Sequence, residues 1–180
     1  MKIGQEIRDW SILMKGNNKG FSLVELLIVM AILAIIGSGA FMSFNVIHNA
    51  NVNNSAGTIN STLSAIRMNN MSKVQTQYLQ IYRVGGYYYY RVDDKAKIDF
   101  NYKLRKLGTS STNVSYITTN STKISDNHGI SISFNRSGEC ILYNSDGSLN
   151  SADLNGITFY NSTRIKSIKI LPVIGKHYLD

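Results

Sequence analysis

The stretch KGFSLVELLIVMAILAIIG, which runs from Lys19 to Gly37, decides how the rest of the chain can fold. It opens an apolar run, Phe21 to Phe44, that contains a single ionisable side chain, Glu25. Because each helical residue rises about 1.5 Å, a helix of this length spans roughly 36 Å and exceeds the ~30 Å hydrocarbon core of a bilayer. The sequence therefore predicts a membrane-spanning helix at 21–44, with a carboxylate one turn from its start.

Glu25 needs an explanation because charge is costly inside a membrane. A carboxylate costs about 2.5–3.5 kcal/mol at the bilayer centre and less near the interface, so it marks a functional position. An ordinary signal peptide is one alternative interpretation, because the small residues 37–40 follow the apolar core. A plain membrane anchor is a second alternative. Neither explains Glu25, and the apolar pattern resumes at Phe41.

The junction before the helix resembles a known processing signal. Gly20, followed by FSLVE (residues 21–25) and an unbroken apolar helix, resembles the class III signal of type IV pilins and pseudopilins. In that family a membrane prepilin peptidase cuts after the glycine, on the cytoplasmic side, and methylates the new amino terminus. The resemblance implies that a leader, residues 1–20, is removed between Gly20 and Phe21 and that Phe21 is N-methylated.

The same resemblance gives Glu25 a role in assembly. After cleavage the α-amine of Phe21 is a cation in apolar surroundings, where an unpaired charge is costly. A neighbouring subunit shifted by about one helical turn could place its Phe21 amine beside Glu25. In the family this contact is thought to set the axial register of the filament. Until a neighbour arrives, the carboxylate is expected to be unpaired.

The resemblance also implies partners and a location. The partners are the prepilin peptidase, other pilin or pseudopilin subunits, an assembly platform protein with its ATPase, and membrane lipid before assembly. The formal charge of the chain is +8, and the four basic and two acidic side chains of the leader contribute a net +2 of it. This modest bias favours a single pass with the leader in the cytoplasm. The expected location is the cytoplasmic (inner) membrane and then a cell-surface or periplasmic filament.

One long helix is expected to continue beyond the membrane segment. No proline occurs before Pro172, so a helix can run from about Ser22 to about Val74. The continuation at 45–76 is amphipathic, although its asparagine-rich part, 49–55, contains poor helix formers and must be held by packing. The stripe that would dock on a sheet consists of Ala56, Ile59, Leu63, Ile66 and Asn70.

The remainder, residues 77–180, shows the period-two pattern of β-strands. Tyr78 to Val84, the pair Gly85-Gly86, and Tyr87 to Val92 are typical of a β-hairpin with a two-residue turn. Without a second long helical pattern, the fold class is α+β: a long amino-terminal helix packed on an antiparallel sheet or small β-sandwich. About seven strands are expected in all; those beyond the hairpin are Asn113 to Thr119, Ile130 to Asn135, Glu139 to Asn144, Gly156 to Tyr160 and Arg164 to Leu171.

A second resemblance covers the end of this β-rich part. The segments ISISFN (130–135) and IKILPVIGK (168–176) resemble the closing strand motifs of the minor pseudopilin H and its FimT-like relatives. Such motifs encode packing rather than chemistry. The resemblance implies a subunit of a type IV pilus, a type II secretion pseudopilus or a competence pilus.

The sequence contains no recognisable catalytic pattern, so the expected protein is not an enzyme and has no cofactor. Its three histidines are scattered and lack metal-ligand spacing to the single cysteine, Cys140. Cys140 is interpreted as a small apolar residue on a strand. Asp146 and Asp153 could belong to an irregular calcium site. Solvated turn residues are the simpler interpretation, because Ser162 stands where an EF-hand has its bidentate carboxylate.

Two features admit nucleic acid as a partner. The tyrosines at 87–90 alternate along a strand, so one face packs inward and the other could form an aromatic surface beside Arg83 and Arg91. Some FimT-like competence pilins bind DNA through basic residues near the carboxy terminus. The corresponding residues here are Arg164, Lys166, Lys169 and Lys176.

The sequence as a whole favours a non-enzymatic structural subunit, a minor pilin or pseudopilin. One alternative is a DNA-binding competence pilin of the FimT-like type. The other is a secreted β-rich binding protein released by ordinary signal peptidase. The start of the mature chain separates the last alternative from the other two.

Overall fold

The computed structural model of the protein describes three parts of the chain: 21–72, 75–102 and 105–180. Side chains of residues 39–45 are excluded from that description. The predicted leader and Val74, the predicted end of the helix, lie outside the described residues. The chain forms two compact units, Met1–Met42 and Ser43–Asp180.

The first unit contains the beginning of helix α2 (Leu23–Ser72). Every residue from Phe21 to Ile36 is exposed, and most of them are large and apolar. Contiguous apolar exposure on this scale marks an interaction surface. Among the described residues, no helix combines the length and the apolar character needed to cross a membrane. The span predicted at 21–44 includes 39–44, whose side chains are not described.

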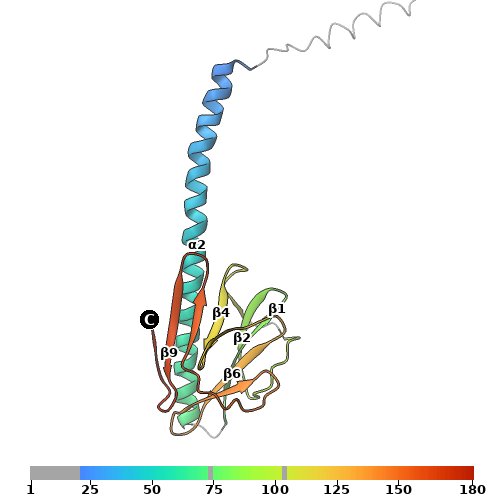
Figure 1. Ribbon diagram of the computed structural model, residues 1–180, viewed down its shortest axis with the longest axis vertical. Coiled ribbons are helices and arrows are strands. Elements are labelled where there is room, and N and C mark those ends of the chain that lie inside the picture. Colours follow the sequence, from blue (N-terminus) through green and yellow to red (C-terminus); the bar gives the residue numbers. More distant parts are fainter. Residues whose placement is uncertain (1–20, 73–74, 103–104) are drawn as a thin grey trace, which may run out of the picture. The chain divides into compact units, whose positions relative to one another are not determined.

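The second unit combines the rest of α2 with two five-stranded antiparallel sheets (Figure 1). The strand order is β3-β2-β1-β6-β7 in one sheet and β10-β9-β8-β4-β5 in the other. The strands are β1 (Tyr78–Val84), β2 (Tyr87–Asp93), β3 (Arg105–Leu107), β4 (Asn113–Ile117), β5 (Ser121–Lys123), β6 (Gly129–Phe134), β7 (Cys140–Asn144), β8 (Gly156–Tyr160), β9 (Ile165–Leu171) and β10 (Lys176–Leu179).

The hydrophobic core joins the buried stripe of α2 to both sheets. Leu79 and Ile132 of the first sheet lie in the same cluster as Phe159 and Ile168 of the second. The predicted α+β class, a long helix on antiparallel sheets, is confirmed. The predicted stripe is also confirmed, because each member is at most 4% exposed: Ala56, Ile59, Leu63, Ile66 and Asn70.

The polar member of that stripe, Asn70, is fully hydrogen-bonded. Its Nδ2 donates to the carbonyl of Gln77 at 2.9 Å and to Ser133 Oγ at 3.0 Å. Its Oδ1 accepts the backbone N–H of Gln77 at 2.8 Å. A buried amide is tolerated when its donors and acceptor are paired, and here the pairs fix the end of α2 to the start of the first sheet.

The predicted hairpin is confirmed as β1 and β2, which pair from Tyr78 opposite Asp93 to Val84 opposite Tyr87. Gly85 and Gly86 have φ values of 59° and 80°, the two positive angles of a type I′ turn. The other expected strands are present with ends shifted by at most two residues. Three strands were not predicted, because β3, β5 and β10 have only three or four residues and no apolar alternation.

The asparagine-rich part of α2 is helical because neighbouring loops hold it. Asn49 Oδ1 accepts Thr163 Oγ1 at 2.8 Å and Asn161 Nδ2 at 3.2 Å, both from the turn between β8 and β9. His48 Nδ1 lies 2.8 Å from Ser111 Oγ, in the loop before β4. Tertiary contacts therefore supply what the helix propensity of this stretch does not.

Gly175 lies where the turn between β9 and β10 meets the turn between β6 and β7. A Cβ at this position would lie 1.8 Å from the carbonyl oxygen of Gly138, and its φ is +59°. Next to it, the N–H of Cys140 donates to the carbonyl of Pro172 at 2.8 Å. The two sheets are thus joined at this end by backbone contact that only glycine permits.

Candidate functional site

The start of α2 is a capping box built by Ser22 and Glu25. The backbone N–H of Ser22 donates to Glu25 Oε2 at 2.9 Å, and the N–H of Glu25 donates to Ser22 Oγ at 3.2 Å. The sequence Ser-x-x-Glu is the pattern that satisfies two free amino-terminal donors of a helix reciprocally. The negative charge of Glu25 also lies at the positive end of the helix dipole.

This geometry adds a contact that was not expected from the sequence. Glu25 was expected to lack a charged partner in the single subunit, and the contact that its Oε2 makes is with the backbone N–H of Ser22. The pattern Ser-x-x-Glu was visible in the sequence and could have revealed the cap. Among the described residues, no hydrogen bond is formed by Glu25 Oε1, so this oxygen remains available for a second donor.

Phe21 directly precedes the capping box and is 84% exposed. Gly20, the expected residue on the other side of the cleavage site, lies outside the described residues. Phe21 is the residue immediately before Ser22, whose N–H donates to Glu25 Oε2. The three residues 21, 22 and 25 therefore form one compact group at the helix start.

Comparison with known proteins agrees with this group of residues. A family model described as the prokaryotic N-terminal methylation motif matches residues 15–41. No curated protein and no solved structure matches the chain.

The match supports one class of protein: the chain carries an N-terminal methylation motif of the kind found in type IV pilins and pseudopilins. This motif implies processing by prepilin peptidase, anchoring in the inner membrane and assembly with other pilins. It covers residues 15–41 and does not reach the segments that resemble minor pseudopilin H, at 130–135 and 168–176.

The four basic residues proposed for DNA binding are largely engaged within the molecule. Lys169 Nζ forms an ion pair with Asp180 Oδ2 at 2.8 Å, and Lys166 Nζ donates to the Asp180 carbonyl at 3.2 Å. The hydrogen bond to Asp180 raises the pKa of Lys169. Arg164 Nε donates to Asn53 Oδ1 at 3.3 Å, while Lys176 is exposed at the start of β10. Asp180 thus balances part of the charge.

The side chains of the tyrosine run, 87–90, also pack against other residues of the molecule. Tyr88 and Tyr90 are 1% and 7% exposed and belong to the core, as expected for one face of the strand. Burial raises the pKa of Tyr88. On the other face, Lys106 Nζ lies 3.4 Å from the ring centroid of Tyr87, and Tyr89 stacks on Tyr82. One ring face of Tyr87 and one of Tyr89 are therefore occupied within the molecule.

Cys140 is buried in the fold, and the two loop aspartates, Asp146 and Asp153, are exposed. Cys140 is 7% exposed at the start of β7, and burial raises its pKa from 9.0 to about 12. Asp146 Oδ1 accepts the N–H and the hydroxyl of Ser148 at 2.8 and 2.6 Å, which lowers the pKa of Asp146. Asp153 lies exposed on the following loop. In the described part of the chain, no three His, Cys, Asp or Glu side chains cluster around a common point.

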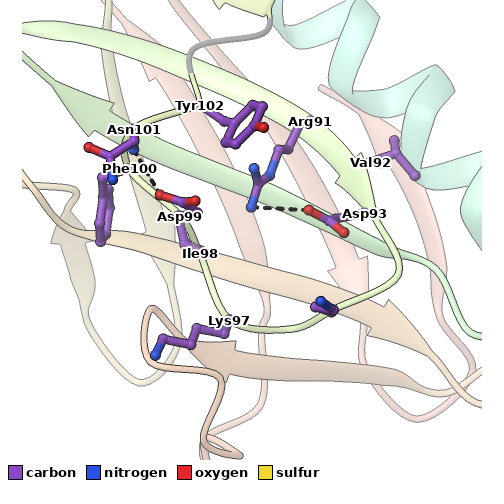
Figure 2. Close-up of a pocket in the computed structure, with 10 residues that line it drawn as sticks. Arg91, Val92, Asp93, Lys97, Ile98, Asp99, Phe100, Asn101 and Tyr102 are labelled. Carbon is purple, nitrogen blue, oxygen red and sulfur yellow. Dashed lines mark hydrogen bonds and ion pairs between the residues drawn. The ribbon is translucent and has the colours of Figure 1, made fainter.

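One feature was missed from the sequence: a cavity of about 760 Å³ beside the loop that follows β2. Figure 2 shows Arg91 and Asp93 on one side of it and Asp99 and Tyr102 on the loop. The loop shows neither helix nor strand periodicity, and the cavity depends on which residues pair across β1 and β2. Of the residues that line the cavity, the sequence had singled out only Arg91, which lies beside the tyrosine run.

Proposed function

We propose that the protein is a minor pilin or pseudopilin, a non-enzymatic subunit of a type IV pilus, a type II secretion pseudopilus or a competence pilus. The observation that carries this proposal is the methylation motif at 15–41, with Phe21, Ser22 and Glu25 grouped at the start of the helix. The exposed apolar residues of 21–36 supply the surface that lipid covers first and other subunits cover later.

In this proposal the Glu25 carboxylate has two partners in the filament. Its Oε2 keeps the N–H of Ser22, while Oε1 accepts the methylated amine of Phe21 from a neighbouring subunit. Charge pairing in an apolar filament core offsets the cost of burying both groups. The contact sets the axial position of one subunit relative to the next.

Two substitutions separate pairing from capping. Glu25→Gln keeps an oxygen for the Ser22 N–H and removes the charge, whereas Glu25→Ala removes both. If the charge sets register, both variants lose incorporation into sheared filaments by at least about tenfold. Processing at Phe21, measured by mass, should remain. Incorporation of Glu25→Gln at the wild-type level would show that the carboxylate acts only as a cap.

We prefer this proposal to the DNA-binding alternative because Asp180 engages Lys166 and Lys169. Sequence-independent DNA binding depends on several free cations beside phosphates. The secreted-protein alternative would require cleavage after the small residues 37–40, within α2. That cleavage would remove the residues that match the methylation motif.

A further inference from the structure

The cavity beside β2 is lined entirely by residues of the second unit, Ser43–Asp180. Gln80 and Arg91 lie opposite each other on the paired strands β1 and β2. Because alternate residues on a strand point to opposite faces, their side chains point away from the core residues Leu79 and Ile81. The cavity therefore lies on the sheet face that does not pack on α2.

Arg91 is fixed in place on the floor of this cavity. Its side chain is 8% exposed, its Nε donates to Gln80 Oε1 at 2.6 Å, and its Nη2 pairs with Asp93 Oδ2 at 3.0 Å. Gln80 is completely buried and in turn donates to the carbonyls of Lys95 and Lys97, at 2.7 and 3.1 Å. Arg91 is buried whereas the Asp93 side chain is 25% exposed, so the guanidinium is held by a hydrogen bond to a buried amide and by a partly exposed ion pair.

The opposite wall is also held before any ligand arrives. Asp99 Oδ1 accepts the N–H of Asn101 at 3.0 Å, and the carbonyl of Tyr102 accepts the hydroxyl of Tyr82. The Tyr102 ring is 61% exposed, and its centroid lies 5.9 Å from Arg91 Cζ. Walls that are fixed in advance lower the entropy cost of binding.

The charges on the two walls select the chemistry of a ligand. In Figure 2 the Arg91 guanidinium lies between Asp93 and Asp99. Arg91 forms an ion pair with Asp93, and Asp99 forms none with any residue that the structure describes. A guanidinium only donates hydrogen bonds, and a carboxylate only accepts them. A hydroxyl group does both, so it can accept from Arg91 while donating to Asp99.

Charged ligands fit less well. A cation would approach three basic side chains, Arg91, Lys95 and Lys97, and an anion would approach the carboxylates of Asp93 and Asp99. A neutral molecule with several hydroxyl groups and one apolar face matches the polar walls and the exposed ring of Tyr102. Sites of this size orient ligands through a few fixed polar groups beside apolar surface.

We propose that this cavity binds a neutral saccharide unit, a hexose or an N-acetylhexosamine, with its hydroxyl groups between Arg91 and Asp99 and its apolar face on Tyr102. The binding residues on the loop are Asp99, Asn101 and Tyr102. The proposal does not depend on assembly through Glu25.

The test is saturation-transfer NMR on the full mature chain in a phosphocholine detergent, which carries no sugar. The probes are a panel of methyl hexosides and methyl N-acetylhexosaminides at millimolar concentration. Tyr102→Ala and Asp99→Ala change exposed side chains, so the fold should be kept. Tyr178→Ala and Asp153→Ala, at exposed positions outside the cavity, are the matched controls.

At least one sugar should receive saturation from the wild-type protein, and both cavity variants should weaken its binding by about tenfold or more. The two control variants should bind like the wild type. The proposal is overturned if no sugar in the panel receives saturation. Equal saturation in the cavity variants and the controls would also overturn it.

Discussion

Ser22 is the residue that defines where α2 begins, because its Oγ accepts the N–H of Glu25 at 3.2 Å. We predict that Ser22→Ala weakens the first turn by about 1 kcal/mol, which corresponds to about fivefold faster amide exchange at Val24 and Glu25. Ser22→Thr keeps the hydroxyl and should exchange like the wild type. Unchanged exchange in Ser22→Ala would mean that the cap does not hold the helix start.

At Gly175 the neighbouring backbone leaves no space for a side chain. We predict that Gly175→Ala lowers the free energy of unfolding by about 2 kcal/mol or more, because its Cβ would collide with the Gly138 carbonyl at positive φ. Gly57→Ala is the matched control. Gly57 lies within α2 with open space around it, so alanine there should stabilise by about 0.5–1 kcal/mol. Denaturant unfolding of both variants measures the difference.

Cys140 gives a prediction that depends on pH. Its pKa is raised by burial from 9.0 to about 12, so its contribution to stability is present below pH 9.0 and is lost between pH 9.0 and about 12. At about pH 8 only about 10⁻⁴ of the native thiol is ionised. Iodoacetamide should therefore modify the folded protein far more slowly than the protein in guanidinium chloride. Equal rates in the two conditions would contradict the burial of Cys140.

At the scale of elements, the buried face of α2 could be predicted from the sequence, but the residues that pack against its asparagine-rich part could not. The spacing of Ile59, Leu63 and Ile66 predicted the buried face correctly, because helical periodicity is a local property. The asparagine-rich part was expected to need packing, but its partners could not be identified. The partner of Asn49 comes from the turn between β8 and β9, and the preceding residue, His48, contacts the loop before β4. The short strands β3, β5 and β10 depend in the same way on neighbours rather than on their own pattern.

The contact between that turn and α2 can be tested directly. We predict that Thr163→Val removes the hydrogen bond to Asn49 and costs about 1 kcal/mol. Amide exchange should become faster at residues 49–55 and stay unchanged at Leu63 and Ile66. Thr163→Ser keeps the hydroxyl and serves as the control. Uniformly faster exchange along α2 would show that the turn does not stabilise this part specifically.

At the scale of the whole molecule, the motif at the start of the helix could be recognised from the sequence, whereas the arrangement of the strands could not. The motif around Phe21 is contiguous in the sequence, so both the resemblance and the family model identify it. The order of strands within each sheet is set by long-range pairing and could not be derived from local patterns. The cavity was missed for the same reason, since it requires the register that places Gln80 opposite Arg91.

Mass analysis of the mature amino terminus tests the central claim most directly. The chain purified from membranes of its host should begin at Phe21 and carry one methyl group on its α-amine. This result follows from the match at 15–41 and from cleavage after Gly20. An intact leader, or a mature chain that begins near Ala40, would contradict the assignment to the type IV pilin class.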